Sequence, residues 1–159
     1  MKQTNTYTFY SHSAEDTQAL ADRIGRLAEP GDVLTLSGDL GAGKTSFTQG
    51  LARGMGISGV VNSPTFTIIK EYMGRLPLYH MDVYRMEDEL EDLGFDEYFY
   101  GDGVTVVEWP QIIAEQLPEE RCDVVITRGE GDERMLVFTP HGRRYEIVCE
   151  AIKHGHSGN

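Results

Sequence analysis

The sequence is short of cysteine, of long apolar runs and of basic residues. Its 159 residues include two cysteines, Cys122 and Cys149, and neither has the spacing of a metal ligand. We expect both to be buried free thiols, which is consistent with a reducing compartment. No stretch approaches the roughly 18 apolar residues that a membrane span requires, and the N-terminal residues lack the apolar core of a signal peptide. Together these absences favour a cytoplasmic protein.

Basic residues are outnumbered by acidic ones. The chain has 14 Lys and Arg against 26 Asp and Glu, which gives a formal net charge of −12. Because neutralisation of phosphates supplies most of the affinity for nucleic acid, this balance disfavours independent binding to RNA or DNA. The acidic residues concentrate at 87–92, where we expect the solvated face of a helix.

The order of the predicted helices and strands indicates the class of fold. The length and a hydrophobic content of 40% suit one domain, which we expect at residues 1–153, followed by a polar, mobile tail at 154–159. Strands and helices alternate early and strands dominate later. This order predicts an α/β fold with a largely parallel central sheet and antiparallel additions, flanked by helices.

The individual elements follow from apolar periodicity and from turn residues. The predicted strands are 7–10, 32–37, 67–72, 76–82, 104–109, 122–128, 135–140 and 144–150. The predicted helices are 15–27, 45–54, 84–94 and one that begins at 110–116, with a helical turn at 95–100. The strands at 67–72 and 76–82 are expected to form a hairpin.

A glycine-rich loop with the pattern G-x-x-x-x-G-K-[ST] lies between a predicted strand and a predicted helix. It occupies Gly38 to Thr45, in the context that a phosphate-binding loop (Walker A) requires. Small residues let the backbone bend around a phosphate chain with its N–H groups pointing inward. Lys44 would reach the β- and γ-phosphates, and the hydroxyl of Thr45 would hold Mg²⁺. The loop therefore predicts a nucleotide-binding fold like that of the P-loop NTPases.

A carboxylate at the end of an apolar strand is the first candidate for supporting chemistry. Glu108 lies near the end of the strand at 104–109, where it could hold Mg²⁺ through water or orient an attacking water. A strand-end carboxylate in solvent is the alternative. We favour the functional role because Trp109 and Pro110 follow, and an unpaired buried charge there would be costly.

The run from His80 to Arg85 is the second candidate. In a strand, His80, Asp82 and Tyr84 share one face, so Asp82 could position water beside the nucleotide with His80 as its neighbour. An exposed antiparallel edge with polar residues outward explains the same pattern, and the residues alone leave both interpretations open. No third nitrogen or sulfur ligand is nearby to complete a metal site.

Thr65 and Trp109 are weaker candidates. Thr65 follows Pro64 in a rigid turn at 63–66 and could contact Mg²⁺ or the γ-phosphate, although a plain turn is the simpler interpretation on chemistry alone. Trp109, the only tryptophan, could stack on a base or on a partner, or it could be a half-buried aromatic side chain at a strand end.

These motifs occur together in the order and at the spacing of one known family. The loop at 38–45, the turn at 63–66, the run at 80–85 and the sequence Glu108-Trp109-Pro110 resemble the TsaE family, also called YjeE. The resemblance covers about residues 5 to 150. That family consists of small bacterial ATPases of tRNA threonylcarbamoyladenosine (t6A) biosynthesis. Gln111 departs from the pattern, where an acidic residue is common, so no role is carried over to it.

The resemblance implies ATP and Mg²⁺ as cofactors and assigns a role to each candidate residue. It implies that Lys44, Asp82 and Glu108 act in catalysis and that Thr45 and Glu108 bind Mg²⁺. It implies that Thr65 lies near the γ-phosphate and that Trp109 lies near the nucleotide. The residues expected to contact the nucleotide are Gly38, Asp39, Leu40, Gly41, Ala42, Gly43, Lys44, Thr45, Ser46, Thr65 and Trp109.

The resemblance also implies a partner, the TsaB–TsaD heterodimer. Its TsaD subunit transfers a threonylcarbamoyl group to an adenosine of tRNA. ATP would bind between this chain and the partner, and hydrolysis would reset the complex between catalytic cycles. The tRNA would be held by the partner subunits, which agrees with the acidic composition of this chain.

Two other functions fit parts of the sequence. A small-molecule kinase shares the loop and the fold, but it needs an acceptor pocket and usually an arginine-rich lid, and the sequence has no such segment. A nucleotide-gated adaptor that does not hydrolyse ATP would also keep the loop. The presence of both carboxylates favours hydrolysis over this adaptor.

Overall fold

A computed structural model describes residues 5–39, 41–59, 61, 69–83 and 94–157 of the chain, with side chains as far as 154. Three predictions lie outside these residues. They are the turn at 63–66 with Thr65, residues 84–93 of the acidic helix predicted over 84–94, with Tyr84 and Arg85, and the placement of Leu40 in the loop.

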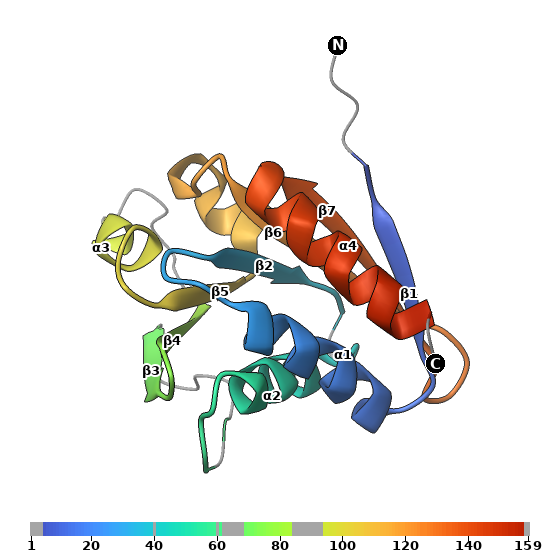
Figure 1. Cartoon of the computed structure of the whole chain (residues 1–159). Coiled ribbons are helices and arrows are strands. Elements are labelled where there is room, and N and C mark those ends of the chain that lie inside the picture. The colour runs from blue at the N-terminus through green and yellow to red at the C-terminus, as the bar shows by residue number, and fades with distance from the viewer. Residues whose placement is uncertain (1–4, 40, 60, 62–68, 84–93, 158–159) are drawn as a thin grey trace.

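A seven-stranded sheet forms the centre of the molecule (Figure 1). The strands are β1 (Tyr7–Ser11), β2 (Val33–Ser37), β3 (Ile69–Met73), β4 (Pro77–Asp82), β5 (Val104–Glu108), β6 (Arg121–Arg128) and β7 (Arg134–His141). They lie in the order β1-β7-β6-β2-β5-β4-β3. Strands β4, β5, β2 and β6 are parallel neighbours, whereas β3, β7 and β1 pair antiparallel. The predicted sheet and the predicted hairpin of β3 and β4 are confirmed.

Helices cover both faces of the sheet. They are α1 (Ala14–Leu27), α2 (Lys44–Gly54), α3 (Phe95–Phe99), the 3₁₀ helix η1 (Pro110–Gln116) and α4 (Arg143–Ser157). Residues of α1, α2 and α4 share one apolar core, and residues of α3 and η1 share a second. Successive side chains of β5 point to opposite faces of the sheet, so Val106 belongs to the first core and Val107 to the second. None of the helices in the described part of the chain is long and apolar enough to span a membrane.

The start of α1 shows how the local sequence defines a helix. Ser13 is the N-cap residue, and its hydroxyl accepts a hydrogen bond of 3.0 Å from the backbone N–H of Asp16. Along α1 and α2, glycines let the two backbones touch. A Cβ at Gly50 would overlap the carbonyl oxygen of Gln18, and one at Gly54 would overlap that of Asp22. The two helices therefore pack with no side-chain layer between them at these points.

The prediction of a strand at 144–150 is wrong, because this segment belongs to α4. Alternating apolar residues suggested the strand, yet Ile147 is 52% exposed while its neighbour Val148 is buried. The buried positions Tyr145, Val148, Cys149 and Ile152 instead follow helical spacing. The helix continues to Ser157, so it also occupies part of the segment predicted as a tail.

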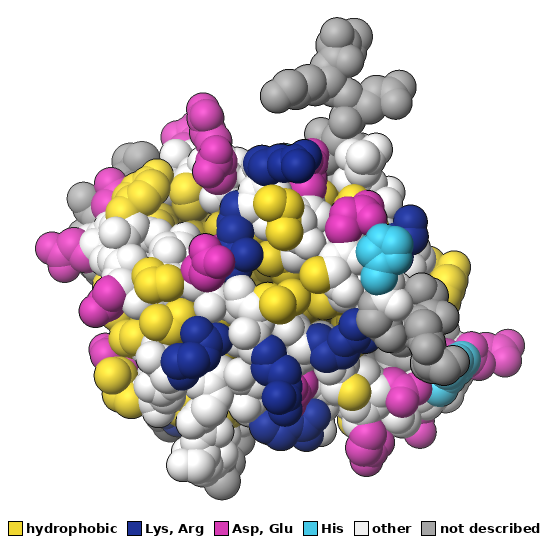
Figure 2. Space-filling view, in the orientation of Figure 1, with side chains coloured by type: hydrophobic (Ala, Val, Ile, Leu, Met, Phe, Trp, Pro, Cys, Tyr) yellow, Lys and Arg dark blue, Asp and Glu magenta, His cyan; other side chains and the backbone are white. Residues whose placement is uncertain are grey.

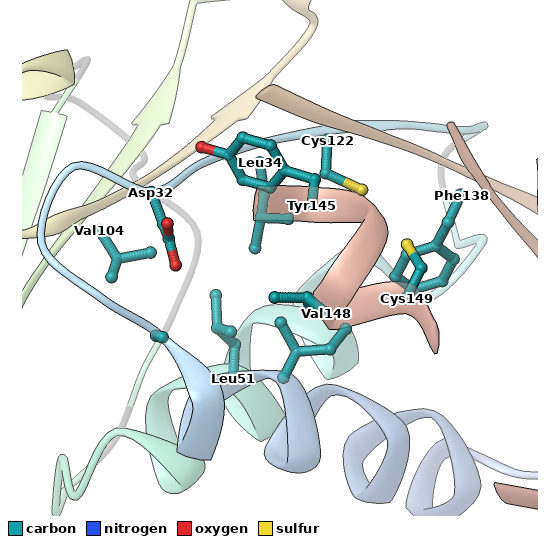
Figure 3. Close-up of a pocket in the computed structure, with 11 residues that line it drawn as sticks. Asp32, Leu34, Leu51, Val104, Cys122, Phe138, Tyr145, Val148 and Cys149 are labelled. Atoms are coloured by element: carbon teal, nitrogen blue, oxygen red, sulfur yellow. The ribbon is translucent and has the colours of Figure 1, made fainter. Parts of the chain in front are cut away.

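Both cysteines are buried free thiols, as predicted, although Cys149 lies in α4 and not in a strand. Figure 3 shows them beside a small, mainly apolar cavity between α4 and the sheet, near Phe138 and Val148. A hydrogen bond with Cys149 and burial raise the pKa of the Cys122 thiol well above its usual value. None of the predicted site residues that the structure describes lines this cavity, so it belongs to the core.

Candidate functional site

The phosphate-loop motif lies at the middle of the parallel part of the sheet. Strand β2 ends at Ser37, and α2 begins at Lys44. Because β2 pairs in parallel with β5 on one side and with β6 on the other, the loop leaves the carboxyl edge between two strand ends. The strand, loop and helix context that the motif requires is therefore present.

Two glycines of the loop are required for different reasons. A Cβ at Gly38 would lie 2.5 Å from the carbonyl oxygen of Ile126, so the loop can rest against β6 only with glycine there. Gly43 is the N-cap residue of α2 and has a φ of 108°, a left-handed conformation that side chains disfavour. No described atom lies within 4 Å of a Cβ built on Gly43, so this part of the loop has an open side.

Lys44, Glu108 and His80 meet at the start of α2. They come from α2, β5 and β4, and they are 7%, 4% and 0% exposed. Lys44 Nζ lies 3.8 Å from Glu108 Oε1, and His80 Nε2 lies 2.5 Å from Glu108 Oε2. The alternative of a solvated strand-end carboxylate is wrong, because Glu108 is buried and each of its oxygens faces a nitrogen.

The hydrogen bonding of His80 indicates which ring nitrogen carries the proton. His80 Nδ1 is buried and has no hydrogen-bond partner among the described residues. A neutral ring protonated on Nε2 leaves only a lone pair unsatisfied at Nδ1, whereas a protonated Nδ1 would bury an N–H without an acceptor. His80 therefore donates through Nε2 to Glu108 and fixes the direction of that carboxylate.

Asp82 lies beside Glu108 at the carboxyl edge. It is half-buried at the end of β4 and is in register with Glu108 of β5. Strand β4 pairs with β5 on one side and β3 on the other, so the alternative of an exposed edge strand for the run at 80–82 is wrong. Register partners on adjacent strands point to the same face, which puts both carboxylates on the face that carries α2.

Trp109 follows Glu108 directly and contacts the loop lysine. Its ring centre lies 4.5 Å from Lys44 Nζ, within the range of a cation–π interaction. Trp109 has a φ of 61°, and it is the only non-glycine residue in the described part of the chain with a positive φ. Such a conformation costs about 1–3 kcal/mol and is concentrated at functional sites.

The chemistry of these side chains suits a hard cation held by oxygen atoms. Thr45 is the second residue of α2 and is exposed, and Glu108 and Asp82 supply carboxylates from adjacent strands. A hydroxyl and two carboxylates match the preference of Mg²⁺, which also keeps several waters and binds phosphate oxygens. The described residues contain no group of three or more His, Cys, Asp and Glu that could hold a metal ion on its own, so the hydroxyl, phosphate and water would have to complete the coordination.

Arg134 is a residue of this region that the sequence analysis missed. It begins β7, and its guanidinium donates hydrogen bonds to the carbonyl oxygens of Ala42 and Gly41 in the loop, at 3.0 and 3.2 Å. The signal that could have indicated Arg134 is its position opposite Arg128 in the β6–β7 hairpin, where β6 ends. That signal needs the strand order, which the sequence alone did not supply.

Comparison with known proteins gives one consistent result. The family model described as "Threonylcarbamoyl adenosine biosynthesis protein TsaE" matches residues 11–136. A protein of Bacillus subtilis (strain 168) named "tRNA threonylcarbamoyladenosine biosynthesis protein TsaE" is 64% identical over 139 residues, 87% of this chain and 88% of its own length. A protein of the same name from Treponema pallidum (strain Nichols) is 50% identical over 111 residues, 69% of this chain and 82% of its own length. A crystal structure of Bacillus subtilis YdiB superposes with a TM-score of 0.87 at 51% identity, covering 98% of this chain and 99% of that one.

Proposed function

Since the chain belongs to the TsaE family of proteins of tRNA t6A biosynthesis, we propose that it is a Mg²⁺-dependent ATPase of that pathway. One observation carries the proposal. The lysine of the phosphate-loop motif lies 3.8 Å from a buried carboxylate, Glu108, at the end of the neighbouring strand. A loop that served only as a turn would have no need of a buried acidic partner for its lysine.

Each side chain has a distinct task in this proposal. The N–H groups of the loop at 38–45 and the N-terminus of α2 bind the phosphates of ATP. Lys44 stabilises the charge on the transferred phosphoryl group. Thr45 and Glu108 hold Mg²⁺, which neutralises phosphate charge when bound. Asp82 positions the attacking water.

The hydrogen bonding of Glu108 divides its two oxygens between support and function. Oε2 accepts from the buried His80 and is fixed. Oε1 faces Lys44 at 3.8 Å, which is longer than a charge-assisted hydrogen bond. Oε1 is therefore the oxygen that can turn to a metal ion or to a metal-bound water when Lys44 binds phosphate.

The nucleotide also has an aromatic neighbour in this proposal. Trp109 lies against Lys44 and is half-buried, so its ring borders the loop. We assign it, together with Thr65 and Ser46, to the nucleotide-binding residues. The identity of the base as adenine follows from the family and not from a base-reading contact.

The proposed partner is the TsaB–TsaD heterodimer, and hydrolysis resets that complex. Thr45 is exposed, so the start of α2 is accessible to a second protein. Figure 2 shows Lys and Arg side chains gathered over α1 and α2 on one face, with acidic side chains spread around them. Two arginines of these helices, Arg26 of α1 and Arg53 of α2, are paired with Asp22. This agrees with tRNA being bound by the partners, in the cytoplasm.

A nucleotide-gated adaptor without hydrolysis is the second candidate function. Such an adaptor would need the phosphate loop to bind ATP. It would not need two carboxylates, Asp82 and Glu108, side by side at the ends of β4 and β5. The pairing of Asp82 with Glu108 therefore favours hydrolysis. A small-molecule kinase is disfavoured, because the sequence contains no arginine-rich lid segment.

Phosphate release from ATP tests the proposal, measured for the chain alone and with the TsaB–TsaD heterodimer. We expect stimulation by the heterodimer that is lost in Lys44→Ala. Equal release with and without the heterodimer would mean a self-sufficient hydrolase and contradict activation by the partner. ATP binding without release in either condition would establish the adaptor, and turnover by Lys44→Ala at the wild-type rate would refute the assignment of the loop.

A further inference from the structure

One side chain ties the phosphate loop to the hairpin of β6 and β7. The guanidinium of Arg134 donates to the carbonyls of Ala42 through Nε (3.0 Å) and of Gly41 through Nη2 (3.2 Å). Its remaining donor, Nη1, bonds the carbonyls of Gly131 and Glu133 at 2.9 and 2.7 Å. Two carbonyls of the loop and two of the hairpin turn therefore share one rigid, planar cation.

These bonds fix the direction of the N–H groups in the loop. In a trans peptide the C=O and the N–H of the same group point in opposite directions, and the described chain has no cis peptides. Because the Ala42 carbonyl points to Arg134, the N–H of Gly43 points away from it. The N–H of Ala42 likewise points away, and it donates to the carbonyl of Asp39 at 3.0 Å.

The loop needs such support because its own residues specify its conformation weakly. Gly41 and Gly43 both have a positive φ, and glycine loses more conformational freedom on ordering than any other residue. Gly38 lies close to the carbonyl of Ile126 in β6, which leaves no room for a Cβ. Arg134 is the side chain that adds directional bonds, and it adds them from the same hairpin.

We propose that Arg134 is a positioning residue for nucleotide binding, which holds the peptide groups of Gly41 and Ala42 so that the Gly43 N–H faces a bound phosphate. This inference rests on the proposed function, because it assigns the loop to the phosphates of a nucleotide. The positive charge of Arg134 would by itself favour anions nearby. The planar fork is what directs the two carbonyls, and a lysine cannot reproduce it.

The experiment compares nucleotide affinity among matched arginine variants of the full chain by calorimetric titration with Mg·ATP and Mg·ADP. Arg134→Gln removes both the planar guanidinium and its charge. Arg134→Lys removes the guanidinium but keeps the charge. Arg75→Gln is the control, since Arg75 makes the same kind of contact with the carbonyls of Ala28 and Gly25, at 3.2 and 2.8 Å, away from the loop.

We expect both Arg134 variants to bind each nucleotide about tenfold more weakly or worse, since a hydrogen bond from a charged group contributes roughly that much. Arg75→Gln should bind within about twofold of wild type while losing a similar amount of thermal stability. In the phosphate-release assay, the KM of Arg134→Lys should rise while its kcat at saturating ATP stays close to wild type.

The outcomes separate this inference from the proposed function. Wild-type affinity in Arg134→Gln, or recovery of wild-type affinity in Arg134→Lys, would overturn the inference and leave the ATPase proposal intact. A wild-type chain that binds neither nucleotide would overturn the proposed function. If Arg134→Gln does not fold, Arg134→Lys compared with Arg75→Lys decides, because both keep the charge at their positions.

Discussion

Two nearly buried carboxylates lie at the two ends of α2 and differ in how completely they are neutralised. Asp22 of α1, beside the end of α2, accepts bonds of 2.6 Å from Arg26 on one oxygen and of 2.6 Å from Arg53 on the other. Glu108, beside the start of α2, has the imidazole of His80 on one oxygen and Lys44 at 3.8 Å from the other. Asp22 is saturated by cations, whereas Glu108 keeps an oxygen that can change partner. Burial does not distinguish these two carboxylates, whereas the contacts of their oxygens do, and the proposed function assigns the chemistry to the less completely paired one.

The largest expected effect tests the Glu108 oxygen that faces Lys44. Glu108→Gln keeps the shape and can still hydrogen-bond, but it removes the charge that would hold Mg²⁺ or orient water. We expect a loss of about 10²–10⁴ in kcat, typical of a missing acid–base group, with nucleotide still bound. Phosphate release in the presence of the partner measures kcat, and calorimetric titration measures nucleotide binding. Unchanged release would transfer the carboxylate role to Asp82.

The saturated carboxylate should show the opposite pattern. Asp22→Asn removes the charge that two arginines bind, and both arginines can then return to water, as their side chains are 72% and 57% exposed. We expect the free energy of unfolding to fall by about 1–2 kcal/mol. Urea denaturation measures this change, and the rate of phosphate release should stay close to wild type. A large loss of activity without a loss of stability would contradict the comparison.

His80→Phe sharpens the comparison by removing the donor to Oε2 of Glu108. The phenyl ring approximates the volume of the imidazole but cannot donate to Oε2. We expect kcat to fall about tenfold because the carboxylate is no longer held in one orientation. Steady-state kinetics at saturating ATP tests this, with Tyr79→Phe on the same strand as the control. An effect as small as that of the control would mean that Glu108 does not depend on His80.

The smallest expected effect concerns pH. Burial raises the pKa of Asp22, but the hydrogen bonds of Arg53 and Arg26 outweigh it and hold the pKa below its usual value. A carboxylate with a lowered folded-state pKa stabilises the fold above its unfolded pKa of about 3.9, and this stability is lost as the pH falls through the folded-state value. The difference in unfolding free energy between wild type and Asp22→Asn should therefore be full at pH 6 and shrink below about pH 4. A difference that stays constant down to pH 2 would contradict this account.

Much of the sheet and of the loop could be predicted because local patterns suffice for them. Apolar runs with β-branched residues, such as Val104 to Val107, and the glycine pattern at 38–45 depend on neighbours along the chain. The segment at 144–150 could not be assigned in this way. Tyr145, Ile147 and Cys149 alternate as in a strand, and only the packing of Val148 and Ile152 against the sheet decides for the helix.

The site was predicted less completely than the fold, for a related reason. Glu108 was identified by its place at a strand end, but its contact with His80 depends on β4 and β5 being neighbours. The contacts of Arg134 with the loop depend on β6 being the other neighbour of β2. Contacts between strands far apart in the sequence require the strand order, and no local pattern supplies it.

The glycine contacts between α1 and α2 have a mechanical consequence. Where two helices meet through side chains, rotamer changes can absorb a small displacement. At Gly50 and Gly54 the backbones touch directly, so no side chain between them can change its rotamer to absorb a displacement. We therefore expect α1 and α2, which begins with Lys44, to behave as one rigid unit.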